Sequence, residues 1–67
     1  MNWNQIEGNW KQFKGSAKAQ WGDLTDNELT EAEGNRDKLV GKIQERYGIA
    51  QEEAERQVDS FAAGLKH

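Results

Sequence analysis

The chain has 67 residues, of which 34% are hydrophobic and 31% are charged, and its formal net charge is −3 at pH 7. This length allows one small domain, which we predict over residues 1–67. The lack of cysteine excludes disulfides and thiolate metal sites, and a single histidine, His67, excludes an imidazole metal cluster. With no apolar run near the ~18 residues of a membrane helix and no signal-peptide pattern at the N-terminus, we expect a cytoplasmic protein without a membrane partner.

The first predicted helix covers residues 3–21. Its apolar residues recur at steps of three and four, which places them on one stripe of a helix. These residues are Trp3, Ile6, Trp10, Phe13, Ala17 and Trp21. The spacing of the tryptophans favours packing in the core over stacking on a ligand. Gly22 follows directly, and a helix ends easily there because glycine adopts the left-handed conformation.

The next segment contains two helix-start signals close together. Residues 25–28 and residues 30–33 both fit a capping box, in which threonine is followed three residues later by glutamate. We therefore expect the helix that begins near Asp26 to be little more than one turn, before the chain starts a new helix at Thr30. This third helix ends at Gly48, and its apolar stripe consists of Ala32, Leu39, Ile43 and Tyr47, with Val40 at the margin.

The last predicted helix covers about residues 51–63. Its apolar stripe consists of Ala54, Val58, Phe61 and Leu65. No segment shows the alternation of a strand, and β-branched residues are few. The sequence therefore predicts an all-α fold of about four helices.

Six of the seven glycines form two triplets with a spacing of seven, at positions 8, 15 and 22 and at positions 34, 41 and 48. A shift of 26 residues superimposes the two triplets and the Glu-Gly-Asn sequences that contain Gly8 and Gly34. We interpret this pattern as an internal duplication with halves at about residues 7–32 and 33–58. Two repeats are too few for a solenoid, so we expect two helical hairpins around a shared aromatic core.

Four glycines form a candidate interaction face. On a helical projection, Gly8 and Gly15 lie opposite the apolar stripe of the first helix, and Gly34 and Gly41 lie opposite that of the third. A smooth face of this kind would let a partner helix or another copy of the protein approach closely. If no partner uses the face, each glycine destabilises its helix by about 1 kcal/mol relative to alanine. The face is therefore either a binding surface or a cause of low stability.

Basic residues near the predicted turns are candidate phosphate contacts. They are Lys11, Lys14, Lys18, Lys42 and Arg46. Each turn has one glycine, where a cradle of backbone amides needs more. The bases also do not repeat with the shift of 26 residues, and the net charge is negative. We therefore favour solvated helix faces over a nucleic-acid site.

The sequence offers no candidate for catalysis. Ser16 and Ser60 have no adjacent base, and the paired carboxylates lie at surface-like helical positions. We expect no catalytic, cofactor or metal site and no small-molecule substrate.

Residues 8–27 and 33–56 carry a family resemblance. Both contain Gly-x6-Gly-x6-Gly blocks in which an aromatic residue precedes the last glycine. Over about residues 3–58 the chain resembles the CsbD-like family of small bacterial general-stress proteins. The resemblance implies a bacterial source, two orthogonal helical hairpins similar to a sterile-alpha-motif bundle, and synthesis raised under stress. It implies no catalytic residue, cofactor or ligand, and it does not extend to residues 59–67.

Three hypotheses for the molecular activity follow. The favoured one is a non-enzymatic module that binds a protein partner or itself through Gly8, Gly15, Gly34 and Gly41. The second is a hydrophilin-like protectant of other macromolecules, suggested by the high glycine content and the mean hydropathy of −1.09. The third is weak nucleic-acid binding through the five basic residues.

Overall fold

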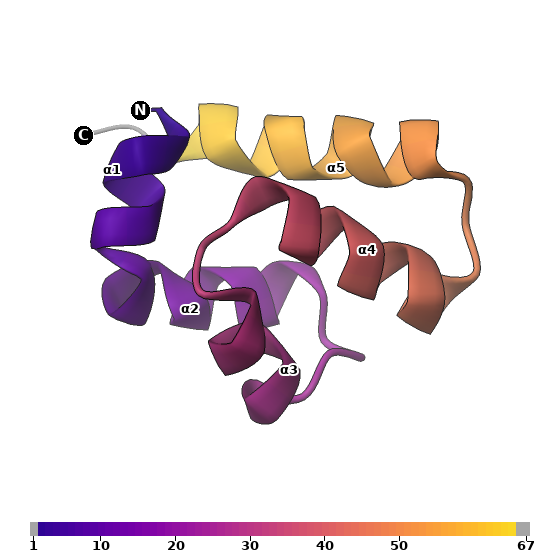
Figure 1. The fold of residues 1–67 in the computed structure, drawn as a ribbon, viewed down its shortest axis with the longest axis horizontal. Helices are drawn as coiled ribbons and strands as arrows, with labels where there is room; N and C mark the ends of the chain where they lie inside the picture. The colour runs from indigo at the N-terminus through magenta and orange to yellow at the C-terminus, as the bar shows by residue number, and fades with distance from the viewer. Residues whose placement is uncertain (1, 66–67) are drawn as a thin grey trace.

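Five α-helices follow one another along residues 2–65, the part of the chain that the computed structural model describes. They are α1 (Trp3–Gly8), α2 (Trp10–Gln20), α3 (Asp26–Ala32), α4 (Arg36–Tyr47) and α5 (Gln51–Gly64) (Figure 1). No residue within this part of the chain is in a strand, which confirms the all-α prediction. The fifth helix arises because the first predicted helix is divided in two.

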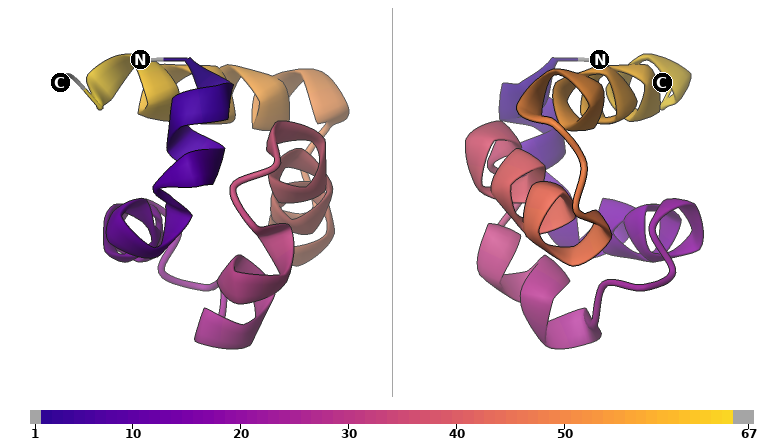
Figure 2. Two further views of the ribbon diagram at one scale, coloured as in Figure 1. Left: turned by 60° about the vertical axis from the view of Figure 1, so that its left-hand side comes forward. Right: turned by 90° about the vertical axis from the view of Figure 1, so that its right-hand side faces the viewer.

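The division lies at Asn9. α1 ends at Gly8, where the low helix propensity of glycine favours a break. The Asn9 side-chain amide donates a hydrogen bond to the Gln5 carbonyl at 3.0 Å, which satisfies an acceptor at the helix end. Figures 1 and 2 show α1 running across the direction of α2. Ile6 from α1 and Trp10 from α2 are both buried in the core as a result.

α2 ends at Gln20, and the predicted left-handed cap at Gly22 is wrong. The capping residue is Trp21, and Gly22 does not have a positive φ. Instead, Lys18 Nζ donates to the carbonyls of Gly22 and Leu24 at 3.0 and 2.5 Å. Because a lysine near a helix C-terminus satisfies the free carbonyls there, this turn does not need a left-handed glycine.

α3 begins as predicted and is longer than predicted. Thr25 Oγ1 accepts the Glu28 N–H at 3.1 Å, and Glu28 Oε1 accepts the Thr25 N–H at 2.8 Å, which confirms the first capping box. The second predicted capping box, at Thr30, is wrong because α3 continues through this residue to Ala32.

The chain turns from α3 into α4 at two left-handed residues, Glu33 with a φ of 55° and Gly34 with a φ of 75°. Asn35 then caps α4, since its side-chain oxygen accepts the Lys38 N–H at 3.0 Å. Asparagine is among the strongest N-cap residues, and it sets the start of α4 at Arg36.

α4 and α5 lie side by side and run in opposite directions (Figure 1). The predicted cap between them is confirmed, since Gly48 has a φ of 64° and donates its N–H to the Gln44 carbonyl at 2.8 Å. Arg36 at the start of α4 forms an ion pair with Asp59 in the second half of α5 at 2.9 Å. This pair and the shared core hold the two helices together.

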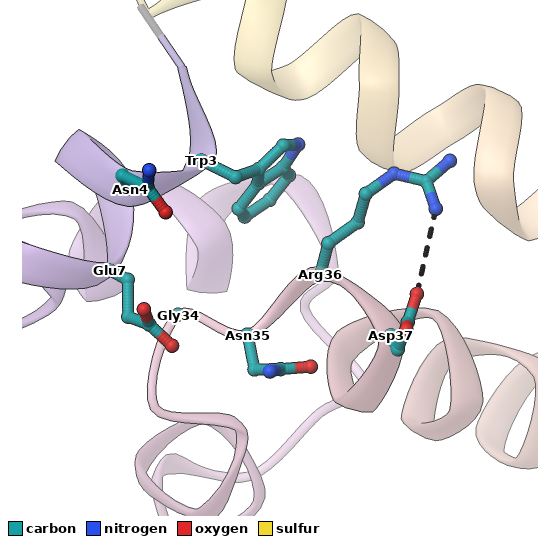
Figure 3. A pocket seen from close by; sticks show the side chains of 7 residues that line it. All are labelled: Trp3, Asn4, Glu7, Gly34, Asn35, Arg36 and Asp37. Atoms are coloured by element: carbon teal, nitrogen blue, oxygen red, sulfur yellow. Dashed lines mark ion pairs between the residues drawn. The ribbon is translucent and has the colours of Figure 1, made fainter.

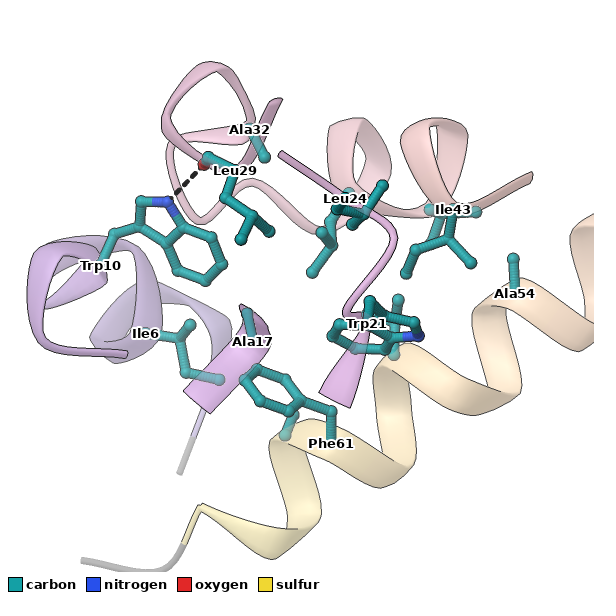
Figure 4. Packing of buried hydrophobic residues seen from close by; sticks show 14 residues of the cluster. Ile6, Trp10, Ala17, Trp21, Leu24, Leu29, Ala32, Ile43, Ala54 and Phe61 are labelled. Atoms are coloured by element: carbon teal, nitrogen blue, oxygen red, sulfur yellow. Dashed lines mark hydrogen bonds between the residues drawn. The ribbon is translucent and has the colours of Figure 1, made fainter. Parts of the chain in front are cut away.

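The core consists of hydrophobic residues from all five helices and from the α2–α3 connection (Figure 4). Within residues 2–65 no polar or charged residue is buried. The buried residues are Ile6, Trp10, Ala17, Trp21, Leu24, Leu29, Ala32, Leu39, Val40, Ile43, Ala54, Val58, Phe61 and Ala62. Leu24 and Leu29 lie on either side of the first capping box and add to the predicted apolar stripes.

The buried tryptophans confirm the predicted core role. Trp10 Nε1 donates to the Leu29 carbonyl at 2.7 Å (Figure 4). Trp21 Nε1 donates to Gln57 Oε1 at 3.0 Å, and its ring lies 5.1 Å from that of Phe61 between centroids.

Tyr47 differs from the prediction that placed it in the apolar stripe. It is 37% exposed, and its hydroxyl accepts the Asp23 N–H at 3.2 Å. The ring therefore joins the end of α4 to the turn after α2 instead of filling the core.

Candidate functional site

Three of the four glycines predicted to form an interaction face are exposed. Gly8 is the last residue of α1, Gly15 lies within α2 and Gly41 lies within α4. A Cβ atom placed on any of these three glycines would meet no neighbouring atom within 4 Å. The space beside them is open, and their use by a partner stays a prediction.

Gly34 differs from the other three because it is buried in the α3–α4 turn and lies outside any helix. A Cβ atom at this position would lie 2.7 Å from Glu7 Cα and 3.2 Å from Trp10 Cβ. Gly34 therefore allows α1 and the turn to approach closely, and it is not available to a partner as an exposed helical face. The two left-handed residues of the turn are the physical reason that the predicted helix does not include it.

The predicted phosphate contacts on α4 are engaged in ion pairs with α3. Lys42 Nζ lies 2.9 Å from Glu31, and Arg46 Nη2 lies 2.8 Å from Glu28. Lys38, one turn earlier on α4, pairs with Glu33 at 3.0 Å. We call these three pairs the α3–α4 ion-pair row. Two of the five cations that the phosphate hypothesis requires, Lys42 and Arg46, are therefore already paired with carboxylates.

In this row, Glu28 accepts hydrogen bonds both from Arg46 and from the Thr25 backbone. Its pKa is lowered to about 2, first because Arg46 donates a hydrogen bond to the carboxylate and second because the Thr25 backbone N–H does so. The carboxylate therefore stays ionised and holds both the cap of α3 and the contact with α4.

The predicted contacts on α2 have three different surroundings. Lys18 is bonded to the carbonyls of the turn, and Lys14 Nζ lies 3.2 Å from Thr30 Oγ1. Lys11 is exposed, with no hydrogen bond or ion pair to another residue of the range 2–65. Lys11 and Lys14 line one hollow of about 280 Å³ together with Trp10 and Thr30.

A second hollow, which we call the Trp3 hollow, lies between α1 and the start of α4 (Figure 3). Its volume is about 310 Å³. The lining residues are Trp3, Asn4, Glu7, Gly34, Asn35, Arg36 and Asp37. No local sequence signal marks this site, because the approach of α1 to the α3–α4 turn is a tertiary contact.

The charges in the Trp3 hollow are unequally satisfied. Arg36 donates two hydrogen bonds to Asp59, at 2.9 and 3.1 Å, which raise the pKa of Arg36 and lower that of Asp59. Its distance to Asp37 is longer, at 3.7 Å. Glu7 has no ion pair within residues 2–65. The hollow therefore presents carboxylates beside a half-buried indole.

A third hollow, of about 420 Å³, lies between α3 and α4. Its lining residues are Glu28, Glu31, Lys38, Gly41, Lys42 and Glu45. Gly41 leaves a gap among these charged side chains, most of which belong to the ion-pair row. This groove is the place where an exposed glycine and a shaped surface coincide.

Within the described part of the chain, no three His, Cys, Asp or Glu residues are grouped to hold a metal ion. Across the same residues no helix has both the length and the apolar character needed to cross a membrane. The three hollows are surface features, and the arrangement suits binding by charge and shape.

Comparison with known proteins gives consistent matches. The sequence pattern described as CsbD-like matches residues 4–56. The chain is 61% identical over 61 residues to the UPF0337 protein YjbJ of Escherichia coli O6:H1, covering 91% of this chain and 88% of that protein. It is 66% identical over 58 residues to a UPF0337 protein of Pectobacterium atrosepticum, covering 87% and 84%. A UPF0337 protein of Nitrosomonas europaea is 60% identical over 62 residues, which are 92% of this chain and 66% of that protein. These names state no molecular activity.

Proposed function

Because this chain belongs to the CsbD-like family of stress-response proteins, we propose that its molecular activity is binding to a protein partner or to a second copy of itself. Membership of the family assigns neither a reaction nor a ligand. The support for a binding function therefore comes from the surface of the molecule.

The observation that carries the proposal is the pair of exposed glycines within helices, Gly15 in α2 and Gly41 in α4. Alanine would fit at both positions, since a Cβ atom would meet nothing within 4 Å and φ is not positive. Each glycine lowers the stability of its helix by about 1 kcal/mol relative to alanine. A domain of this size has roughly 3–5 kcal/mol in total. Because these two glycines lower the stability of their helices and no neighbouring atom occupies the space beside them, a role in contact with another surface is favoured.

The groove at Gly41 adds a second argument. Most of the side chains around it are already held by ion pairs of 2.8–3.0 Å, which α4 forms with α3 and with the turn that follows α3. A partner that enters the gap would meet a preorganised rim, so less side-chain entropy is lost on binding. Gly41 is therefore the exposed glycine that we expect to matter most.

The test is a crosslinked pull-down from stressed cells, with the tagged wild type compared with Gly15→Gln and Gly41→Gln. Glutamine is a good helix former, so the fold is retained while the side chain fills the open space. We expect the wild type to capture a defined partner, or its own untagged copy, and both variants to capture several-fold less. Mass spectrometry of the crosslinked peptides identifies the contact.

Ser16→Gln is the matched control. Ser16 is exposed on α2 next to Gly15, about 100° further around the helix. This variant should capture as much partner as the wild type. Capture that is equal for the wild type and both glycine variants contradicts the proposal, and so does the absence of any crosslinked protein.

A further inference from the structure

We propose that a second copy of this chain is a partner, and that Lys11 of one copy binds in the Trp3 hollow of the other, beside Glu7. This inference rests on the proposed binding function and names the partner and the contact.

The Trp3 hollow has the chemistry of a cation site. Glu7 has no ion pair within residues 2–65, and the side chain of Asp37 is 94% exposed. Arg36, the cation in the lining, directs two hydrogen bonds to Asp59. Figure 3 shows the Trp3 indole on the wall that α1 contributes, together with Glu7. An ammonium group placed there would meet a carboxylate and the face of an indole, both of which attract it.

Lys11 is the matching donor. Five other basic residues within residues 2–65 pair with carboxylates, and Lys14 and Lys18 have hydrogen-bond partners; the five are Arg36, Lys38, Lys42, Arg46 and Arg56. Lys11 is also the second residue of α2, where the positive end of the helix dipole disfavours a cation. Within residues 2–65 the Lys11 ammonium group forms no ion pair.

The break at Asn9 explains why the two charges stay unpaired. Glu7 and Lys11 are four residues apart, a spacing that forms an ion pair in a continuous helix. Here Glu7 belongs to α1 and Lys11 to α2, and no ion pair joins them. Within residues 2–65 the chain thus presents a carboxylate without an ion pair in a hollow and an ammonium group without an ion pair on a neighbouring helix. Two copies can satisfy both charges at once.

The association should be weak and dependent on salt. A stable interface buries about 800 Å² per partner, close to a fifth of the 4275 Å² that this chain exposes. A contact built on Lys11 and the Trp3 hollow is smaller than that. Exposed charge pairs are screened by salt, so the dimer should dissociate as the ionic strength rises.

The experiment is sedimentation velocity of the full chain over a range of concentrations, at about 50 mM and about 500 mM NaCl. We expect the wild type to associate at low salt and to become monomeric at high salt. Glu7→Lys alone and Lys11→Glu alone should each be monomeric at concentrations where the wild type associates. An equimolar mixture of the two variants should associate again, because each reversed charge then meets its complement.

Two further variants control for the change in net charge. Glu52→Lys makes the same charge change as Glu7→Lys, and Arg56→Glu makes the same change as Lys11→Glu, at exposed residues outside both the proposed contact and the groove at Gly41. Both should associate as the wild type does, and circular dichroism should show unchanged helix content for all four.

The inference is overturned if the wild type is monomeric at low salt, or if Glu7→Lys associates like the wild type. It is also overturned if the mixture does not restore association. Each of these results leaves the broader binding function intact as long as the pull-down captures a different protein. Equal capture by the wild type and both glycine variants in the pull-down, in contrast, contradicts the broader function and not the Lys11 contact.

Discussion

Gly34 has no room for a side chain. A Cβ atom on it would lie 2.7 Å from Glu7 Cα, and its φ of 75° is strained for any other residue. We predict that Gly34→Ala lowers the free energy of unfolding by about 2 kcal/mol or more, because α1 or the turn must shift. Urea unfolding followed by tryptophan fluorescence measures the change. A loss below about 0.5 kcal/mol would show that α1 moves aside freely.

Gly15 and Gly41 should respond in the opposite direction. Both are exposed within helices, with open space where a Cβ atom would be added. We predict that Gly15→Ala and Gly41→Ala each raise the free energy of unfolding by up to about 1 kcal/mol. The same urea experiment compares them with Gly34→Ala. A decrease for either would mean that the glycine has a role inside the monomer.

The sequence around these glycines does not distinguish the exposed glycines from the buried Gly34. Gly8 and Gly34 both lie in the sequence Glu-Gly-Asn, yet Gly8 is exposed at the end of α1 and Gly34 is buried with a left-handed backbone. The difference comes from α1 packing against the α3–α4 turn. This contact is tertiary, so the sequence predicts the positions of the glycines without predicting which of them a partner can reach.

At the scale of elements, Trp10 connects α2 to α3. The Leu29 carbonyl lies in the last turn of α3, where a short helix leaves acceptors unpaired, and the Trp10 indole N–H satisfies it at 2.7 Å. We predict that Trp10→Phe lowers the free energy of unfolding by about 1–3 kcal/mol, because a buried acceptor loses its partner.

Trp3→Phe is the control for Trp10→Phe, measured by thermal and urea unfolding. Trp3 is half-buried, and its indole N–H forms no hydrogen bond to another residue of the range 2–65. The loss for Trp3→Phe should be clearly smaller. Equal losses for the two variants would mean that ring size, and not the hydrogen bond, determines the effect.

Glu28 connects α3 to α4 and makes this connection sensitive to acid. Its pKa is about 2 in the folded protein, below the ordinary value of 4.5, chiefly because of Arg46. The stabilisation is therefore present above about pH 4.5 and is lost as the pH falls toward 2. We predict that the wild type loses more thermal stability between about pH 5 and pH 2 than Glu28→Gln does. Asp59 adds to the loss in both proteins, because Arg36 lowers its pKa.

Glu45→Gln is the control for this pH series. Glu45 is exposed on α4 and forms no ion pair within the described chain. It should keep the acid sensitivity of the wild type. If Glu28→Gln keeps it as well, the contact with Arg46 does not stabilise the fold.

The helices were predictable in type, and their boundaries were predictable where a local signal was decisive. The capping box at Thr25 and the glycine cap at Gly48 are confirmed. Thr30 carries an equally good local signal, but Asn35 lies after the left-handed turn and caps α4 instead. The break at Asn9 was missed because the apolar period continues through it. The apolar period indicates which residues face the core. Because the period continues through the bend between α1 and α2, it does not reveal the bend.

The ion-pair row shows the same limit for the candidate site. Lys38, Lys42 and Arg46 recur every four residues, so their common helix face is evident from the sequence. Their pairing with α3 depends on how two helices meet, which no local pattern encodes. In the tertiary structure, four of the five predicted phosphate contacts have a hydrogen-bond or ion-pair partner, and Lys11 has none within residues 2–65.

At the scale of the whole molecule, the duplication stays a prediction, and the order of the helices can be compared with it. α2 and α4 begin 26 residues apart, at Trp10 and Arg36, and an asparagine precedes each. A short helix also precedes each, α1 in one case and α3 in the other. α3 lies in the predicted first half, and it packs both against α2 of that half and against α4 of the second. We propose that this packing makes residues 7–32 and 33–58 one cooperative domain, with two orthogonal hairpins as the expected arrangement.

The size of the folded chain bears on the protectant hypothesis. The radius of gyration is 10.6 Å, close to the value of about 11 Å expected for a folded domain of this length. We predict one cooperative unfolding transition, with a urea m value of about 1 kcal/mol/M. The double variant Gly15→Ala/Gly41→Ala should raise the free energy of unfolding by about 2 kcal/mol, since the two sites share no contact.

The double variant also distinguishes two roles for the exposed glycines, low stability of the fold and binding to a partner. A protectant that works through a soft fold should protect a labile enzyme less during drying once the fold is stabilised. A binding module should show no such change, because alanine leaves the groove at Gly41 nearly as open as glycine does. We expect equal protection by the wild type and the double variant, at the level of an unrelated folded protein of equal mass. If the double variant protects the enzyme less than the wild type, the role of the exposed glycines is instead to keep the fold flexible. Glu7 and Lys11 would then be the remaining features that point to a partner.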